Sequence, residues 1–196
     1  SPSERLDQIR RDYAERVSSR TRPPDPRVVA AFATVPRERF LGPGPWLIRS
    51  ADGYIRTPDA DPARIYRDVL VALEPLQRLN NGQPSLHAAA IARLGLRRGE
   101  TVLHIGAGTG YYTAILAELV GPAGHVHAYE IEPRLAALAR ANLAERENVV
   151  LHDETEQPVL PPADAIYVNA GAGGPQRRWL DALTSAGRLI FPLTGD

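Results

Sequence analysis

Cysteine and methionine are both absent from the 196-residue sequence. The lack of cysteine excludes disulfides, thiolate metal sites and cysteine nucleophiles, and it is typical of proteins that work in the reducing cytoplasm. The lack of methionine even at position 1 leads us to expect a fragment of a longer protein. No apolar run approaches the ~20 residues of a membrane-spanning helix, and the charged N-terminus lacks a signal peptide's apolar segment. We therefore expect no membrane partner.

The sequence also lacks an excess of charge of either sign. Lys and Arg number 23, as do Asp and Glu, so the formal net charge is zero. This balance does not indicate a nucleic-acid partner. The five histidines have no spacing typical of metal ligands, and we expect no metal site; they stand at positions 87, 104, 125, 127 and 152.

Residues 1–75 are predicted to form an N-terminal extension of helices and loops. Apolar residues recur at helical spacing over 3–18, and a capping aspartate followed by proline favours a second helix over 28–35. Residues 41–63 are rich in Gly, Pro and Asp, so we expect a loop there.

From residue 84 onwards the pattern alternates between strands and helices. Helices are expected from the residues after Gly110 to Val120, from Pro133 to about Glu145, and near 176–183. Repeated β-α-β units imply right-handed crossovers and a mostly parallel sheet with helices on both faces. Residues 76–196 are therefore predicted to form a Rossmann-like α/β domain, with strands at 101–105, 125–130, 148–152, 164–168 and 187–193.

A glycine-rich turn lies between the first of these strands and its helix. Gly106, Gly108 and Gly110 allow a sharp bend and let a ligand approach main-chain N–H groups. The dinucleotide fingerprint needs a glycine at position 111, where this chain has Tyr111. The turn therefore favours a nucleoside cofactor and disfavours NAD.

Polar residues follow the next three strands. Glu130 ends the second strand, 20 residues after Gly110, where a carboxylate can accept hydrogen bonds from both ribose hydroxyls. Asp153 follows the third strand and is placed to accept a hydrogen bond from an adenine amino group; a solvated loop acid is the alternative. Asn169 follows the fourth strand and would face the reacting centre, with a turn-forming asparagine as the alternative.

These segments give the chain a resemblance to the protein-L-isoaspartate O-methyltransferase family, whose members share the class I methyltransferase fold. The glycine motif is common to many methyltransferases, whereas the Val-Pro-Arg and Gln-Pro-x-x-His-Ala segments are more specific. The matching stretches occur in the family's order at residues 35–40, 66–68, 82–88, 102–111, 165–171 and 187–192.

The resemblance implies that the cofactor is S-adenosylmethionine, with S-adenosylhomocysteine as the product. It implies that the glycine turn lines the methionine part, that Glu130 holds the ribose, and that Asp153 and Glu154 meet the adenine. It also implies that the 80–87 segment closes over the cofactor. The candidate cofactor residues are His87, Gly106, Ala107, Gly108, Thr109, Gly110, Tyr111, Glu130, Ile131, Asp153, Glu154 and Asn169.

Two features depart from the family pattern. The family usually has Ser where this chain has Gly82, and that Ser is thought to touch the acceptor carboxylate. The candidate catalytic residues of this acceptor-side loop are Asn80, Asn81, Gly82 and Ser85. Class I methyltransferases also usually end with two more strands, which would follow Asp196, so we expect missing C-terminal strands and an exposed sheet edge.

The leading hypothesis is an O-methyltransferase that acts on an Asp or isoAsp carboxylate in a peptide or protein. Relatives that methylate Asp in ribosomally made natural products suit the Gly82 variant, and the N-terminal extension would contribute the acceptor cleft. The alternatives are a non-catalytic S-adenosylmethionine-binding module, a methyltransferase of a small-molecule acceptor, and a nicotinamide oxidoreductase.

Overall fold

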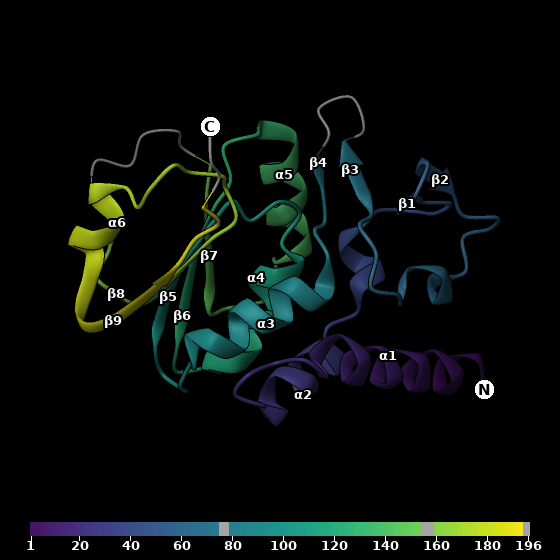
Figure 1. The fold of residues 1–196 in the computed structure, drawn as a ribbon, viewed down its shortest axis with the longest axis horizontal. Coiled ribbons are helices and arrows are strands. Elements are labelled where there is room, and N and C mark those ends of the chain that lie inside the picture. Colours follow the sequence, from purple (N-terminus) through teal and green to yellow (C-terminus); the bar gives the residue numbers. More distant parts are fainter. Residues whose placement is uncertain (75–78, 154–158, 194–196) are drawn as a thin grey trace. The chain divides into compact units, whose positions relative to one another are not determined.

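The computed structural model describes residues 1–74, 79–153 and 159–193 (Figure 1). The chain divides into two compact units, Ser1–Arg93 and Leu94–Asp196. This division falls later than the predicted domain boundary after residue 75. Within the described ranges, no helix combines the length and apolar character needed to cross a membrane.

Two helices open the N-terminal unit, as the sequence predicts. Helix α1 spans Pro2–Ser18 and begins with a capping box between Ser1 and Glu4, in which each side chain binds the other residue's main-chain N–H. Helix α2 spans Pro26–Thr34 and is capped by Asp25. The two helices pack through buried aromatic residues, and the rings of Tyr13 and Phe32 lie 6.3 Å apart.

The prediction of a continuous loop over 41–63 is wrong. Strand β1 (Leu47–Ser50) pairs antiparallel with strand β2 (Gly53–Arg56), and two 3-10 helices flank this hairpin, η1 (Arg37–Phe40) and η2 (Pro62–Ile65). The hairpin is held by a small core of Trp46, Ile48, Ile65 and Val71, which are distant in sequence. Burial of these apolar side chains outweighs the local Gly, Pro and Asp content.

The remaining elements of this unit lead to the acceptor-side loop. Strand β3 (Ala72–Glu74) pairs antiparallel with strand β4 (Leu79–Asn80). Helix α3 then spans Pro84–Leu94 and begins with a proline, which suits the first turn of a helix. The candidate residues run from Asn80 at the end of β4, through residues 81–83, to Ser85 in the first turn of α3.

A five-stranded parallel sheet forms the C-terminal unit, in the order β7-β6-β5-β8-β9. This confirms the predicted Rossmann-like class I methyltransferase fold. The strands are β5 (Thr101–Ile105), β6 (His125–Tyr129), β7 (Val149–His152), β8 (Ala163–Val168) and β9 (Leu183–Ile190). The helices are α4 (Tyr111–Val120), α5 (Pro133–Asn142) and α6 (Arg177–Ala182). The last strand begins at Leu183 instead of the predicted 187, because α6 ends after six residues and the backbone turns extended at once.

Helices cover both faces of the sheet, with α6 on one side and α4 and α5 on the other (Figure 1). The alternation of side chains along β5 follows this arrangement. Leu103 belongs to the cluster around Trp179 of α6, whereas the neighbouring His104 contacts Thr113 of α4. Both faces of the sheet are buried at this point, since Leu103 and His104 are each 0% exposed.

His104 is a polar residue inside this core. Its Nε2 lies 2.7 Å from the amide nitrogen of Asn169 and its Nδ1 lies 2.8 Å from the Thr113 hydroxyl. The amide NH2 can only donate, so Nε2 accepts and the proton sits on Nδ1. Burial lowers the pKa of His104 to about 3, and the imidazole is therefore neutral at physiological pH.

This burial predicts an acid-sensitive fold. A histidine in an unfolded chain has a pKa of about 6.5. Between that pH and about 3, His104 therefore binds a proton in the unfolded chain but not in the folded chain. Stability should be full above the unfolded pKa and fall as the pH drops, by at most about 1.4 kcal/mol per pH unit. Urea unfolding at several pH values measures this slope.

A matched variant separates His104 from the other titrating groups. His104→Gln keeps an acceptor for Asn169 but cannot titrate, so its slope should be smaller than that of the parent chain. Equal slopes in the two proteins would contradict the assignment.

Candidate functional site

The glycine turn follows β5 at the point where the strand order reverses, since the chain runs from β5 outward to β6 and β7 and then returns to β8 beside β5. Ligands of open parallel sheets bind beyond the carboxyl ends of the strands at this place. Gly106, Gly108 and Gly110 have φ of 83°, 58° and 97°, a region that side chains rarely adopt. A Cβ on Gly110 would also lie 2.8 Å from Leu143.

The Glu130 carboxylate binds the glycine turn directly. One oxygen accepts from the N–H of Gly108 at 2.7 Å, and the other accepts from the N–H of Glu132 at 2.9 Å. Glu130 is only 8% exposed, so these bonds are formed away from bulk water. Glu132 in turn caps α5 by accepting from the N–H of Leu135 at 2.7 Å. One acid therefore joins the turn after β5 to the turn after β6.

Asn169 lies beside the glycine turn. Its N–H donates to the carbonyl of Ile105 at 2.7 Å, and the backbone at Asn169 and Ala170 leaves little room next to Gly106, where a Cβ would lie 3.3 Å from the Ala170 nitrogen. The side-chain amide is oriented by His104 at 2.7 Å. The structure thus brings Asn169 and Gly106 together at the reversal point.

Ile131 and Asp153 lie at the ends of the neighbouring strands. Ile131 is 66% exposed, so its side chain is accessible to a ligand. Asp153 is exposed and receives a hydrogen bond from Arg140 at 2.8 Å, so one of its oxygens is occupied. Glu154 lies outside the described residues.

The rest of the turn is buried, at Ala107, Thr109, Gly110 and Tyr111. The carbonyl of Thr109 accepts from Asn142 at 3.0 Å. The N–H groups of Ala107 and Gly110 donate to the carbonyls of Tyr129 and Ala107, both at 3.0 Å. These positions therefore support the turn from within the protein.

The acceptor-side loop, residues 80–85, is held by its own side chains. The side-chain Oδ1 of Asn80 accepts from the N–H of Gly82 at 2.8 Å, which closes a local turn. Asn81 is 7% exposed, and its oxygen accepts from Arg37 through both Nε and a terminal nitrogen, at 3.2 and 3.1 Å. Both asparagines thus shape the loop; their predicted role towards an acceptor stays a prediction.

Arg37 is fully buried below this loop. Besides Asn81, its guanidinium donates to the carbonyls of Ile65, Arg67 and Val69 at 2.6, 3.0 and 2.9 Å. A buried charge is stable only when it is well hydrogen-bonded, and the planar guanidinium offers five donors for this purpose. Arg37 therefore fixes the 65–69 segment against the acceptor-side loop.

Asp68 fixes the other end of the loop. Its two oxygens accept from the N–H of Ser85 at 2.9 Å and from the Gln83 side chain at 3.0 Å. Partial burial raises the pKa of Asp68, but these hydrogen bonds and the charge of Arg37 outweigh it and leave the pKa below its usual value. Asp68 is therefore ionised at neutral pH.

His87 lies against Gly82. The Gly82 φ is 73°, and a Cβ built on it would lie 2.3 Å from His87 Nε2. The imidazole therefore occupies the space into which a side chain at position 82 would project. Gly82 and His87 are both half-buried.

Sequence reasoning missed the roles of Arg37, Asp68 and His104. Arg37 and Asp68 do lie in two of the family-like stretches, which was the available signal. For His104 the signal was a histidine in an otherwise apolar strand. Among residues 1–74, 79–153 and 159–193, no three His, Cys, Asp or Glu side chains are arranged to hold a metal ion.

The donor set around the reversal point suits S-adenosylmethionine. A carboxylate at the end of β6 can bind ribose hydroxyls, the exposed Ile131 can cover a purine, and the glycine turn allows close approach of the amino-acid part. The Glu130 oxygens each retain a lone pair beyond their main-chain bonds.

Known proteins resemble this chain over most of its length. The family model described as Protein-L-isoaspartate(D-aspartate) O-methyltransferase matches residues 57–196. The protein-L-isoaspartate O-methyltransferase of Methanothrix thermoacetophila is 35% identical, over 85% of this chain and 73% of its own. That of Rhodopseudomonas palustris is 37% identical (88% and 72%), and that of Thermotoga maritima 30% (85% and 50%). The chain thus spans half to three-quarters of the length of these relatives.

Solved structures agree with the sequence relatives. A protein-L-isoaspartate O-methyltransferase superposes with a TM-score of 0.76 at 27% identity, covering 94% of this chain and 55% of that one. A second, from Plasmodium falciparum in complex with S-adenosyl-L-homocysteine, shares the fold with a TM-score of 0.73 at 21% identity, covering 95% and 85%. The chain belongs to the protein-L-isoaspartate O-methyltransferase family of S-adenosylmethionine-dependent methyltransferases.

Proposed function

We propose that this chain transfers a methyl group from S-adenosylmethionine to the free carboxylate of an Asp or isoAsp residue in a peptide or protein. The observation that carries the proposal is the Glu130 carboxylate bound to the glycine turn, in a chain of this family. The relatives' names supply the acceptor class, and Gly82 leaves open whether isoAsp or Asp is preferred.

The proposed reaction requires little acid-base catalysis by the protein. When bound, S-adenosylmethionine supplies a methyl group already activated on a sulfonium. An acceptor carboxylate, with an ordinary pKa near ~4, is ionised at neutral pH and needs no general base. The chain's residues therefore have to bind and orient the two reactants and exclude water. Glu130 and the glycine turn would bind the cofactor, and the acceptor-side loop, held by Arg37 and Asp68, would bind the acceptor.

A methyl-transfer assay tests the proposal. The chain is incubated with radiolabelled S-adenosylmethionine and matched isoaspartyl, aspartyl and C-terminal carboxyl peptides. A methyl ester releases its label as methanol in mild base, which distinguishes it from methylated nitrogen. Transfer to a small acid alone would favour a small-molecule acceptor, and tight S-adenosylhomocysteine binding without any transfer would favour a non-catalytic module. Tight binding of NAD instead would favour an oxidoreductase.

Glu130→Ala should weaken S-adenosylhomocysteine binding by about 1–3 kcal/mol, the scale of hydrogen bonds to a charged group. The loss combines the ribose contact with the bond that holds the Gly108 N–H. Titration calorimetry measures the affinity, and thermal unfolding checks the fold. Glu147→Ala, which removes an exposed acid, should change nothing. Unchanged affinity in folded Glu130→Ala protein would defeat the ribose assignment.

Gly82→Ser should raise kcat/KM on isoaspartyl peptides by about tenfold, the scale of one added hydrogen bond to a charged group. The new side chain must displace the tip of His87, and the φ of 73° should cost about 1 kcal/mol of stability. Gly82→Ala is the matched control, because it carries the same Cβ and strain without a hydroxyl. Equal activities of the Ser and Ala variants would remove the hydroxyl as the determinant.

A further inference from the structure

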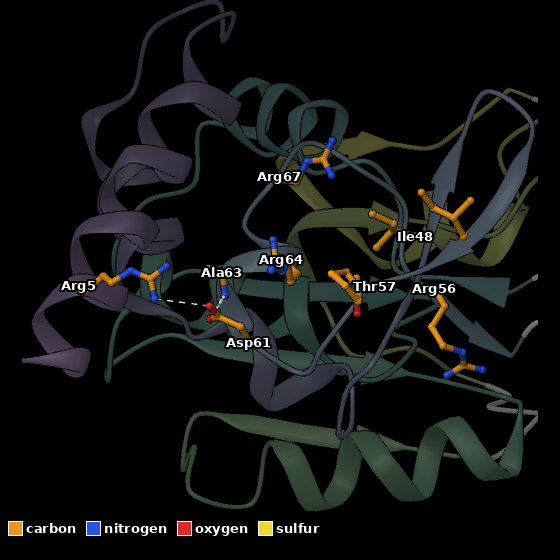
Figure 2. A pocket seen from close by; sticks show the side chains of 10 residues that line it. Arg5, Ile48, Arg56, Thr57, Asp61, Ala63, Arg64 and Arg67 are labelled. Carbon is orange, nitrogen blue, oxygen red and sulfur yellow. Dashed lines mark hydrogen bonds and ion pairs between the residues drawn. The ribbon is translucent and has the colours of Figure 1, made fainter.

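A cavity lies entirely within the N-terminal unit, and none of the residues that line it is a candidate cofactor or acceptor residue. Its volume is about 290 Å³, and its walls combine Ile48 and Ile55 with four arginines, Arg5, Arg56, Arg64 and Arg67 (Figure 2). We refer to this set of six residues as the arginine cavity. Ile55 is 51% exposed, so the apolar wall is open to a partner.

The positive charge of the arginine cavity is only partly neutralised. Arg64 is fully engaged, because its guanidinium donates to both oxygens of Asp59 at 3.0 and 2.8 Å. Arg5 reaches Asp61 only at 3.5 Å (Figure 2), while the other Asp61 oxygen accepts from the N–H of Ala63 at 3.0 Å. Asp59 is thus paired with Arg64, and Asp61 is divided between a long contact with Arg5 and a hydrogen bond with the backbone.

Arg56 and Arg67 retain their charge for a ligand. The side chain of Arg56 makes one long contact, 3.5 Å to the carbonyl of Pro45. Within the described part of the chain, neither Arg56 nor Arg67 forms an ion pair with a carboxylate. The four arginines carry four positive charges, and Asp59 and Asp61 carry two negative ones. The local charge is therefore +2, in a chain whose net charge is zero.

The spacing of the arginines indicates what the cavity holds. They come from separate elements, α1, β2, η2 and the segment after η2, and Arg5 and Arg56 stand at opposite ends of the view in Figure 2. Cations spread along an apolar wall suit an extended chain bearing carboxylates better than one compact phosphate. Arginine forks bind carboxylates and phosphates alike, so the wide spacing of the arginines is what favours an acidic chain, and the zero net charge gives no nucleic-acid footprint.

The arginine cavity is also joined to the acceptor-side loop. Arg67 precedes Asp68, whose oxygens hold Ser85 and Gln83, and the Arg67 carbonyl accepts from Arg37. A short segment, 65–69, therefore supports both the loop and one wall of the cavity. Resting on the proposed function, we propose that the arginine cavity binds acidic side chains of the acceptor polypeptide at a distance from the residue that is methylated.

The test compares two labelled peptides that each carry one isoaspartyl residue, one rich in Glu and one with Gln at every Glu position. Fluorescence anisotropy is measured with S-adenosylhomocysteine present, so that no methyl group is transferred. The parent chain should prefer the Glu peptide, and rising ionic strength should weaken that preference. Arg56→Gln/Arg67→Gln should reduce affinity for the Glu peptide by about threefold to tenfold and leave the Gln peptide unaffected.

Arg20→Gln is the control, since Arg20 is exposed just after the end of α1 and does not line the cavity. It should keep the preference for the Glu peptide. No preference in the parent chain, or an equal loss in Arg20→Gln, would overturn the proposal. Displacement of the Glu peptide by equimolar inorganic phosphate or by a single-stranded oligonucleotide would overturn the acidic-peptide assignment.

A methyl-transfer assay on the same two peptides, with radiolabelled S-adenosylmethionine in place of S-adenosylhomocysteine, separates this inference from the proposed function. Methyl transfer to the Gln peptide without any preference for Glu would overturn the arginine cavity alone and leave the methyltransferase standing. A preference for Glu that depends on Arg56 and Arg67, with no transfer to any peptide, would overturn the proposed function and retain the cavity as a peptide-binding site.

Discussion

The cofactor half of the molecule depends on the bond between the Glu130 carboxylate and the N–H of Gly108. One buried acid pairs the N–H of Gly108 in the glycine turn and the N–H of Glu132 in the turn after β6. The same carboxylate keeps acceptor capacity, which the proposed function assigns to a ribose. If that assignment holds, one side chain both supports the fold and binds the ligand, and the position tolerates little change.

The α/β architecture was predictable because its signals are local. Alternating apolar strands, the glycine turn and the proline at the start of α5 all lie within short windows of sequence. The β1–β2 hairpin was missed because its core pairs Trp46 and Ile48 with Ile65 and Val71, contacts that no local pattern reveals. Local glycine and proline content gave the wrong prediction there, since nonlocal burial decides the structure.

The candidate site also combines features that have local sequence signals with features that depend on distant contacts. Residues 106–110 and Glu130 stand at fixed offsets from strand ends, so their places could be predicted. The network that shapes the acceptor-side loop could not, because Arg37 reaches Asn81 across 44 positions and Asp68 reaches Ser85 across 17. Such contacts arise only when the chain folds, and a resemblance between motifs can mark the residues without stating what they contact.

This difference bears on how the two halves can diverge. The cofactor half is built from the glycine turn and from the Glu130 carboxylate that binds it, and neither feature specifies an acceptor. The acceptor-side loop depends on side chains, and at Gly82 the imidazole of His87 occupies the volume that another residue would fill. Because Arg37 and Asp68 hold the loop from beneath, an exchange at position 82 alters what the loop presents without dismantling its support. If the loop contacts the acceptor as proposed, acceptor choice can change at this one residue while the methyl-transfer scaffold is retained.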